Sequence, residues 1–118
     1  MIQSVSNSRT GNGTMYIGSR LRGRILAIKI VAGAVTDNYD MTLTGETTGM
    51  PIFTHLNLTL STTEWYFPRV LASDNADESI SADSYVEIPI LNERIKCVIA
   101  NAGTAADVAV TVFYDSED

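Results

Sequence analysis

The sequence is poor in the residues on which several common classes of protein depend. Its 118 residues include one cysteine and one histidine, and eight lysine or arginine residues stand against fourteen acidic ones. The lone cysteine, Cys97, cannot form an intrachain disulfide, which fits a reducing compartment. Its apolar neighbours predict a buried thiol on the face shared with Ile95 and Ile99. The net charge of −6 argues against nucleic-acid binding, which depends on clustered lysine and arginine.

Long apolar runs are also missing. No stretch approaches the roughly 18 apolar residues that predict a membrane-spanning helix. The N-terminal sequence MIQSVSNSRTGNG has no apolar core of the kind found in secretion signals. We therefore expect no membrane partner and no secretion signal.

Residues suited to catalysis or metal binding are few and scattered. His55 has polar neighbours and no spacing that pairs it with a serine or cysteine nucleophile, and no glycine-rich phosphate loop is present. The segment SDNADES offers oxygen ligands at Asp74, Asn75, Asp77 and Glu78, but it lacks the glycine and final glutamate of an EF-hand loop. We expect no catalytic residue, no cofactor and no metal site, although ion binding by the acidic loop Asp74–Glu78 stays open.

Strand patterns, by contrast, fill most of the chain. YDMTLTG alternates apolar and polar residues from Tyr39 with the period of a half-buried strand, as do LNLTL (56–60) and YVEIPIL (85–91). Pro89 has no backbone N–H to donate, so we expect the last of these strands to lie at an edge of the sheet, or Pro89 to face away from the neighbouring strand. GRILAIKIVAG (23–33) is apolar on both faces, which is typical of a central strand. Two more runs are rich in β-branched residues: RIKCVIA and DVAVTVFYD.

Turn signals between these runs predict the connections. TGETTG follows the strand that ends near Gly45, NAGTAAD joins the last two strands, and LNER indicates a hairpin between residues 86–91 and 94–100. The polar segment from Ala72 to Ser84 is typical of a long loop. About eight or nine short strands predict an all-β fold, a single antiparallel β-sandwich or jelly-roll-like domain.

The first thirteen residues have little apolar content. We expect residues 1–13 to form an extended N-terminal arm that becomes ordered on a neighbouring subunit, and residues 14–118 to form the β-sandwich domain.

An arginine stripe is the first candidate for a subunit interface. Arg20, Arg22 and Arg24 recur at every second residue, so an extended segment presents them on one face. This face could be a solvated edge that discourages aggregation, or it could pair with an acidic neighbouring subunit.

The aromatic run WYFPRV is the second candidate. On a strand, Trp65 and Phe67 share one face and Tyr66 takes the other. We expect Trp65 and Phe67 to face the core, which leaves Tyr66 and Arg69 near the surface as interface residues. The alternative is a tyrosine that lies over an arginine stem with its hydroxyl in water.

Five segments between Gly23 and Tyr114 occur in a recognisable order: GRILAIKI, YDMTLTGETTGMPIF, WYFPRVLA, VEIPILNERIKCVIANAG and VTVFYD. In this order they resemble small β-sandwich structural proteins of tailed bacteriophages. Those proteins have a long first strand, a strand that ends in a TG turn, an aromatic-Pro-Arg strand and two closing strands. Residues 1–22 lie outside the resemblance.

The resemblance implies a virion component without a catalytic site, assembled in the cytoplasm of the host bacterium. The leading hypothesis is a capsid decoration or cement protein, a homo-oligomer that stabilises the assembled head through contacts between its own copies and with the major capsid protein. A neck or tail component and the base of a head fibre remain alternatives. A carbohydrate- or receptor-binding module, in which Trp65 or Tyr66 stacks on a sugar, is the alternative from a different class.

Overall fold

The structure is a computed structural model and describes residues 1–33, 38–58, 63–71, 85–102 and 106–116. These residues form nine β-strands and no helix, so the expected all-β fold is confirmed. The strands are β1 (Ile2–Thr10), β2 (Gly13–Gly33), β3 (Tyr39–Gly45), β4 (Pro51–Leu58), β5 (Thr63–Tyr66), β6 (Arg69–Leu71), β7 (Tyr85–Glu87), β8 (Pro89–Ala100) and β9 (Asp107–Ser116).

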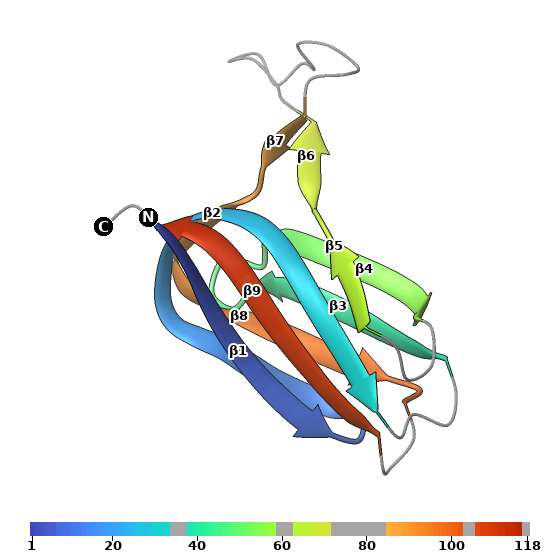
Figure 1. Cartoon of the computed structure of the whole chain (residues 1–118). Coiled ribbons are helices and arrows are strands. Elements are labelled where there is room, and N and C mark those ends of the chain that lie inside the picture. Colours follow the sequence, from blue (N-terminus) through green and yellow to red (C-terminus); the bar gives the residue numbers. More distant parts are fainter. Residues whose placement is uncertain (34–37, 59–62, 72–84, 103–105, 117–118) are drawn as a thin grey trace.

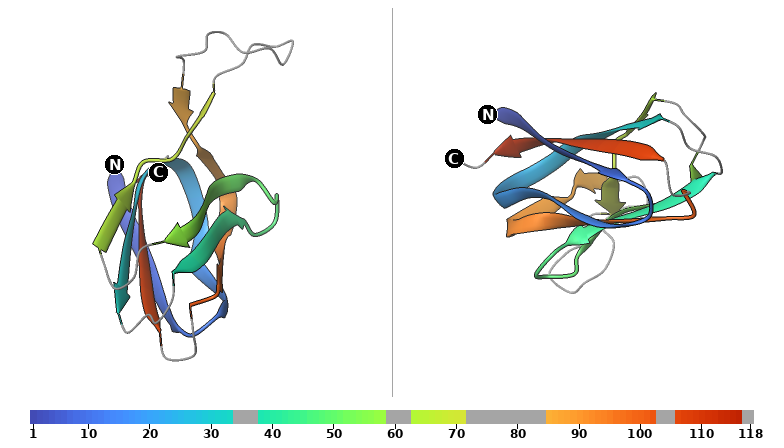
Figure 2. Two further views of the ribbon diagram at one scale, coloured as in Figure 1. Left: turned by 90° about the vertical axis from the view of Figure 1, so that its right-hand side faces the viewer. Right: turned by 90° about the horizontal axis from the view of Figure 1, so that it is seen from below.

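One antiparallel sheet folds over to make both layers of a sandwich. Its strand order is β1-β9-β2-β8-β3-β4, and β5 also pairs with β2. The long strand β2 belongs to both layers, because residues 13–24 pair with β8 whereas residues 23–33 pair with β9. The first layer therefore contains β1, β9, the second half of β2 and β5. The second layer contains the first half of β2, β8, β3 and β4, and Figure 2 shows the two layers side by side. The predicted antiparallel β-sandwich is confirmed, with residues 23–33 as a central strand.

The core lies between the two layers and is built by alternation along the strands. In β9, Val108, Val110 and Val112 point inward and are fully buried. From the opposite layer, β8 contributes Cys97, which is fully buried among isoleucines as predicted. Alternating apolar residues thus account for most of the fold, as expected for sheets that bury one face.

The LNER segment is not the hairpin that its residues indicate. Residues 89–100 form one continuous strand, and Asn92 has a left-handed φ of 61° at a shift in register between Arg22↔Leu91 and Leu21↔Glu93. A single residue in this conformation makes a β-bulge rather than a turn, because β2 continues alongside and keeps both halves of β8 paired. Pro89 is the first residue of the strand, a position where the absence of a backbone N–H costs no hydrogen bond of the ladder.

A second correction concerns the strand predicted at residues 56–60, of which residues 59 and 60 lie outside the described residues. Leu58 is buried, but Leu56 is 63% exposed. A register shift between the pairs Tyr39↔Leu58 and Met41↔His55 changes which side chains of β4 face the core. The alternation therefore breaks at a bulge that the sequence pattern does not reveal.

The N-terminal segment is an edge strand of the sandwich, and the expectation of an arm outside the β-domain is wrong for its residues 2–10. All nine residues of β1 pair with β9, from Ile2↔Asp115 to Thr10↔Asp107. Backbone pairing does not require apolar side chains, and Val5 alone of this strand packs partly against the core. Gly11 and Gly13 have φ values of 81° and 141°, which let the chain turn sharply into β2.

Strands β6 and β7 form a separate two-stranded sheet, called here the ribbon, that projects from the sandwich (Figure 1). Its base is held by the Ile25 amide, which donates to the Ile88 carbonyl oxygen at 2.8 Å, and by Arg69, which donates to the Leu26 carbonyl oxygen at 3.2 Å. The loop predicted from Ala72 to Ser84 lies outside the described residues.

Candidate interaction surfaces

The candidate residues for catalysis and metal binding do not gather into a metal-binding group in the described part of the chain. This part contains no group of three histidine, cysteine or acidic side chains that could hold a metal ion. The His55 ring lies beside the rings of Phe53 and Tyr66, at centroid distances of 6.1 and 5.3 Å, and its Nδ1 is 2.9 Å from the Leu56 carbonyl oxygen. The acidic segment Asp74–Glu78 lies outside the described residues. Among those residues there is also no helix long and apolar enough to cross a membrane.

The arginine stripe is exposed on the second layer. Leu21, Gly23 and Ile25 are buried, so Arg22 and Arg24 point outward, as their spacing predicts. Arg20 is also exposed, but it lies in an irregular segment of β2 between the pairs Ile17↔Ile95 and Leu21↔Glu93.

Two basic residues of β8 extend this stripe across the layer. Lys96 lies opposite Tyr16 in the β2–β8 register, and the Arg94 guanidinium lies 4.1 Å from the centre of the Tyr16 ring. Arg94 Nε also donates to Glu46 at 2.6 Å, and this hydrogen bond lowers the pKa of Glu46. We call this surface the basic face; its charged members are Arg20, Arg22, Arg24, Arg94, Lys96 and Glu46.

The basic face concentrates charge of one sign on an acidic molecule. It holds five of the eight lysine and arginine residues. The whole chain carries −6 and the six charged side chains of this face carry +4, so the rest of the chain carries −10. Exposed apolar side chains lie among the charges: Leu91, opposite Arg22, is 51% exposed, and farther along the same pair of strands Tyr16, opposite Lys96, and Val98 are partly exposed. The alternation in RIKCVIA places Arg94 and Lys96 outward, but only the β2–β8 pairing brings them beside the arginine stripe.

The outer surface of the first layer has a different character. We call it the serine–aromatic face; its members are Ser4, Ser6, Ser8, Lys29, Val31, Trp65, Ala109, Thr111 and Phe113. The rings of Trp65 and Phe113 stack at 5.5 Å with an interplanar angle of 27°. Ala27, which is opposite Phe113, is only 7% exposed. Lys29 is the one lysine or arginine among these members, and its Nζ lies 5.5 Å from the Trp65 ring.

The aromatic run faces the opposite way from our expectation. Tyr66 pairs with Ile28, whose side chain points into the core, and its ring packs against Phe53 at 4.8 Å. Trp65 is consequently turned outward and is 49% exposed, and Phe67 is exposed as well. The period of the strand was predictable, but the register with β2 decides which side faces inward. Tyr66 is therefore a partly buried core residue, and Arg69 donates to the Leu26 and Pro68 carbonyl oxygens at the ribbon base.

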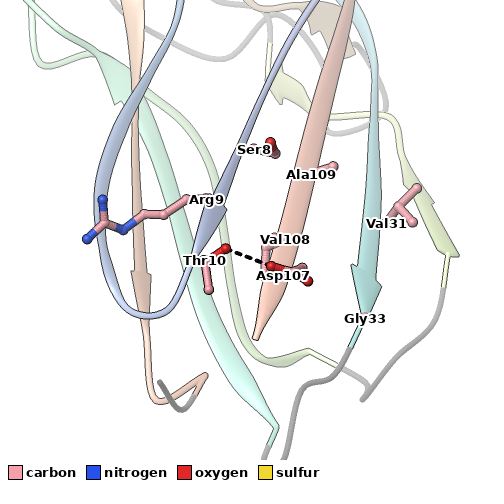
Figure 3. A pocket seen from close by; sticks show the side chains of 8 residues that line it. All are labelled: Ser8, Arg9, Thr10, Val31, Gly33, Asp107, Val108 and Ala109. Atoms are coloured by element: carbon pink, nitrogen blue, oxygen red, sulfur yellow. Dashed lines mark hydrogen bonds between the residues drawn. The ribbon is translucent and has the colours of Figure 1, made fainter. Parts of the chain in front are cut away.

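A shallow hollow of about 290 Å³ lies at the end of the serine–aromatic face where β1 and β2 end and β9 begins. Figure 3 shows residues that line it, among them Val31, Ala109 and Gly33, and also Thr10, whose hydroxyl donates to Asp107 at 2.7 Å. A Cβ atom added at Gly33 would meet no atom within 4 Å. The hollow is thus an open depression that could receive an apolar side chain of a partner.

The turn after β3 is fixed to the second layer by a buried carboxylate. Glu93 is 5% exposed and accepts hydrogen bonds from the Thr47 amide at 2.7 Å, the Thr48 amide at 2.9 Å and the Thr48 hydroxyl at 2.7 Å. Burial acts to raise the pKa of Glu93, but these hydrogen bonds outweigh it and hold the pKa below its usual value. The same turn carries Glu46, so Glu93 also positions the partner of Arg94 at the border of the basic face.

Comparison with solved structures gives a structural likeness. The chain resembles a chain of the "Acidic stable capsid structure of Helicobacter pylori bacteriophage KHP30", with a TM-score of 0.57 and 12% sequence identity. The alignment covers 97% of this chain and 87% of that chain. At this identity the likeness establishes a shared fold. No protein-family model matches the sequence, and no curated protein matches it.

Proposed function

We propose that this protein is a structural component of a tailed-bacteriophage virion, a decoration or cement subunit of the assembled head. The observation that carries the proposal is the fold likeness to a chain of a phage capsid structure over nearly the whole length of both chains. The order of strand motifs from Gly23 to Tyr114 supports the same class of protein. Its partners would be other copies of itself and the major capsid protein, and its place would be the virion, assembled in the host cytoplasm.

The serine–aromatic face is the surface we assign to the shell. Its small side chains allow close approach of a second surface, and Trp65, which is exposed and stacked on the partly buried Phe113, supplies apolar area to bury. A subunit that binds only the assembled shell stabilises it through mass action, by about 2.7 kcal/mol for each site when the free subunit is present at about 100 times its Kd.

The test is binding to heads of the parent phage that lack this protein. We expect the purified protein to sediment with assembled heads, to stay in solution with unassembled capsid protein, and to raise the temperature at which heads release DNA. Binding to isolated necks or tails and not to heads would favour the neck or tail alternative. Binding to none of these particles would overturn the proposal.

Carbohydrate binding is retained as a second candidate because Trp65 is exposed. Trp65 is the only tryptophan of the chain, so its fluorescence reports directly on a stacked sugar. Saturable quenching by surface glycans of the host, with no binding to heads, would favour this candidate over the capsid role.

A further inference from the structure

Strand β1 has one side of its backbone bonded to the sheet and one side open. It is the first strand in the order of the main sheet, and among the described residues it pairs with β9 alone. Just beyond one end of this pairing, the Gly11 amide donates to the Ala106 carbonyl oxygen at 2.7 Å. Beyond the other end, the Ser116 amide donates to the Met1 carbonyl oxygen at 2.8 Å.

These two flanking bonds fix which residues of β1 face β9. Because bonded and non-bonded pairs alternate along an antiparallel ladder, the odd-numbered residues of β1 exchange hydrogen bonds with β9. The even-numbered residues therefore direct their N–H and C=O groups away from the sheet; they are Ile2, Ser4, Ser6, Ser8 and Thr10. We call this row of backbone groups the β1 edge.

The side chains of β1 hold the strand from its inner side and leave the β1 edge open. Asn7 Nδ2 donates to the Tyr16 carbonyl oxygen at 2.8 Å, and the Tyr114 hydroxyl donates to Gln3 at 2.9 Å. On the β1 edge, the Ser8 amide donates to Oδ1 of the adjacent Asn7 at 2.8 Å, a local contact that the side chain can give up. Figure 1 shows β1 beside β9 at the margin of the first layer.

The β1 edge lacks the features by which β4 and β5 discourage pairing. It has no proline and no lysine, and its register with β9 runs without a shift from Ile2 to Thr10. The one charged side chain of β1, Arg9, is folded back, with Nη2 donating to the Asn12 carbonyl oxygen at 2.8 Å. Strand β4, at the other end of the sheet order, begins with Pro51 and shifts its register with β3, and β5 has four residues. A long, regular edge without such protection is a template for a further strand.

The strand that matches this edge is β1 of a second copy. When two β1 strands pair in opposite directions over their full length, Ser6 of each copy lies at the two-fold axis and the even-numbered residues form the bonded pairs, as the open side requires. Arg9 then lies opposite the uncharged Gln3, so like charges do not meet. Ser4 lies opposite Ser8, and their small side chains can share hydrogen bonds.

We propose that two copies pair along their β1 edges, antiparallel and centred on Ser6, so that their first layers join into one continuous sheet. Side chains directly opposite each other in such a pair lie on the same face of the sheet, so the two serine–aromatic faces lie side by side. The dimer does not depend on the proposed function. What it does in the virion rests on that function: it presents two exposed Trp65 side chains to the shell, and two linked contacts bind more tightly than one. The basic face stays free for an acidic neighbouring subunit.

Ser6→Pro tests the pairing. The substitution removes an N–H that points to the open side and not to β9, so the monomer should keep its fold. The two central hydrogen bonds between the copies are lost, and the dissociation constant of the dimer should rise roughly tenfold or more. Sedimentation velocity over a concentration series measures the dissociation constant, and circular dichroism with thermal melts checks the fold.

A pair of charge variants tests the register. Ser6→Lys and Ser6→Glu each place two like charges opposite each other at the axis, so each alone should be monomeric at concentrations where the parent is a dimer. An equimolar mixture of the two should form a one-to-one heterodimer that weakens as salt is added. Thr111→Lys and Thr111→Glu are the matched controls, because Thr111 lies opposite Ser6 on β9, one strand in from the edge. Each control should dimerise as the parent does.

Three results would each overturn the inference: a parent that stays monomeric at the highest concentration, a Ser6→Pro variant that dimerises as the parent does, or a Lys–Glu mixture without heterodimer. A monomeric parent whose binding to heads is abolished by Ser6→Pro would also overturn it, since the β1 edge then receives a strand of the shell. Head binding is scored separately. A monomer that binds heads refutes the pairing and leaves the proposed function standing, whereas a dimer that binds no heads supports the pairing and refutes the function.

Discussion

At the scale of single residues, Cys97 shows how burial changes acid–base behaviour. Burial raises the pKa of its thiol from 9.0 to about 12. In the unfolded chain the thiol loses its proton at a lower pH than in the folded protein. Its contribution to stability is therefore complete below pH 9 and is lost as the pH rises toward 12.

We predict that the parent loses stability with rising pH faster than Cys97→Ala does. Tyr39, whose pKa burial also raises to about 12, acts in both proteins and cancels in the comparison. The extra slope from Cys97 is at most about 1.4 kcal/mol per pH unit. Urea unfolding of both proteins at several pH values between 8 and 11 gives the free energy of unfolding of each. The difference between the two slopes against pH measures the contribution of Cys97. Parallel pH profiles, or rapid labelling of the thiol in the folded protein, would contradict the burial argument.

Glu93 provides the opposite pH dependence. Because hydrogen bonds from Thr47 and Thr48 lower its folded-state pKa, its contribution is present above pH 4.5 and is lost as the pH falls through the folded pKa. We expect Glu93→Gln to lower stability by about 1–3 kcal/mol at neutral pH, since the amide cannot accept at both positions. The mutant should also lose less stability on acidification than the parent.

Glu46→Gln is the matched control on the same turn. Glu46 is exposed, and the side chains of its ion pair with Arg94 are partly exposed, so its removal should change stability only slightly. Thermal melts at neutral pH compare the two variants. Equal losses for both would mean that the hydrogen bonds of Glu93 do not stabilise the turn.

The residue scale also shows what the sequence can and cannot specify. The burial of Cys97 was predictable, because apolar residues surround it at every alternate position. The outward position of Trp65 was not, because the alternation in WYFPRV is the same in both orientations. Only the pairing Ile28↔Tyr66 distinguishes them, and it joins residues that are far apart in the chain.

At the scale of elements, β1 protects an edge of the sandwich. Deletion of residues 1–10 removes the whole pairing with β9 and exposes a strand of alternating apolar residues. We predict a melting temperature lower by roughly 10 °C or more, because several ladder hydrogen bonds are lost together. The truncated protein should also aggregate, because an uncovered edge pairs with other chains.

Ser6→Ala, an exposed change on β1, should melt as the parent does. Light scattering during the melt detects the aggregation. A truncated protein that stays soluble and melts with the parent would mean that the β1–β9 pairing contributes little, and that the first ten residues act as an arm after all.

The LNER segment illustrates why some elements could not be predicted. Asparagine tolerates a left-handed backbone, so the sequence correctly marks Asn92 as a site of irregular geometry. Whether such a residue makes a turn or a bulge depends on the neighbouring strand. Strand β2 spans 21 residues and stays paired with β8 on both sides of Asn92, and this long-range pairing turns the expected hairpin into one bent strand.

At the scale of the whole molecule, the two outer faces differ in how they can bind. Burial of an aromatic stack depends little on salt, whereas attraction between exposed charges is screened within about 8 Å at physiological ionic strength. The sequence shows an arginine stripe and an aromatic run. It does not show that they lie on opposite layers, because that separation arises from the bend of β2 between Gly23 and Arg24.

This separation predicts two distinguishable losses of head binding. Trp65→Ala should weaken attachment by about 2 kcal/mol or more, roughly thirtyfold, at every salt concentration, because a buried aromatic anchor at an interface contributes energy of this size. Arg22→Glu should weaken attachment mainly at low salt, since it acts through contacts between neighbouring copies. Leu56→Ala, which changes an exposed apolar residue on β4 outside both faces, serves as the control and should bind as the parent does.

Co-sedimentation with heads over a series of salt concentrations measures the binding of all three variants, and thermal melts of the free proteins exclude unfolding as the cause of a loss. If Trp65→Ala binds heads as tightly as the parent, the serine–aromatic face does not contact the shell. A loss for Arg22→Glu that is unchanged by salt would show that the stripe acts through shape rather than charge.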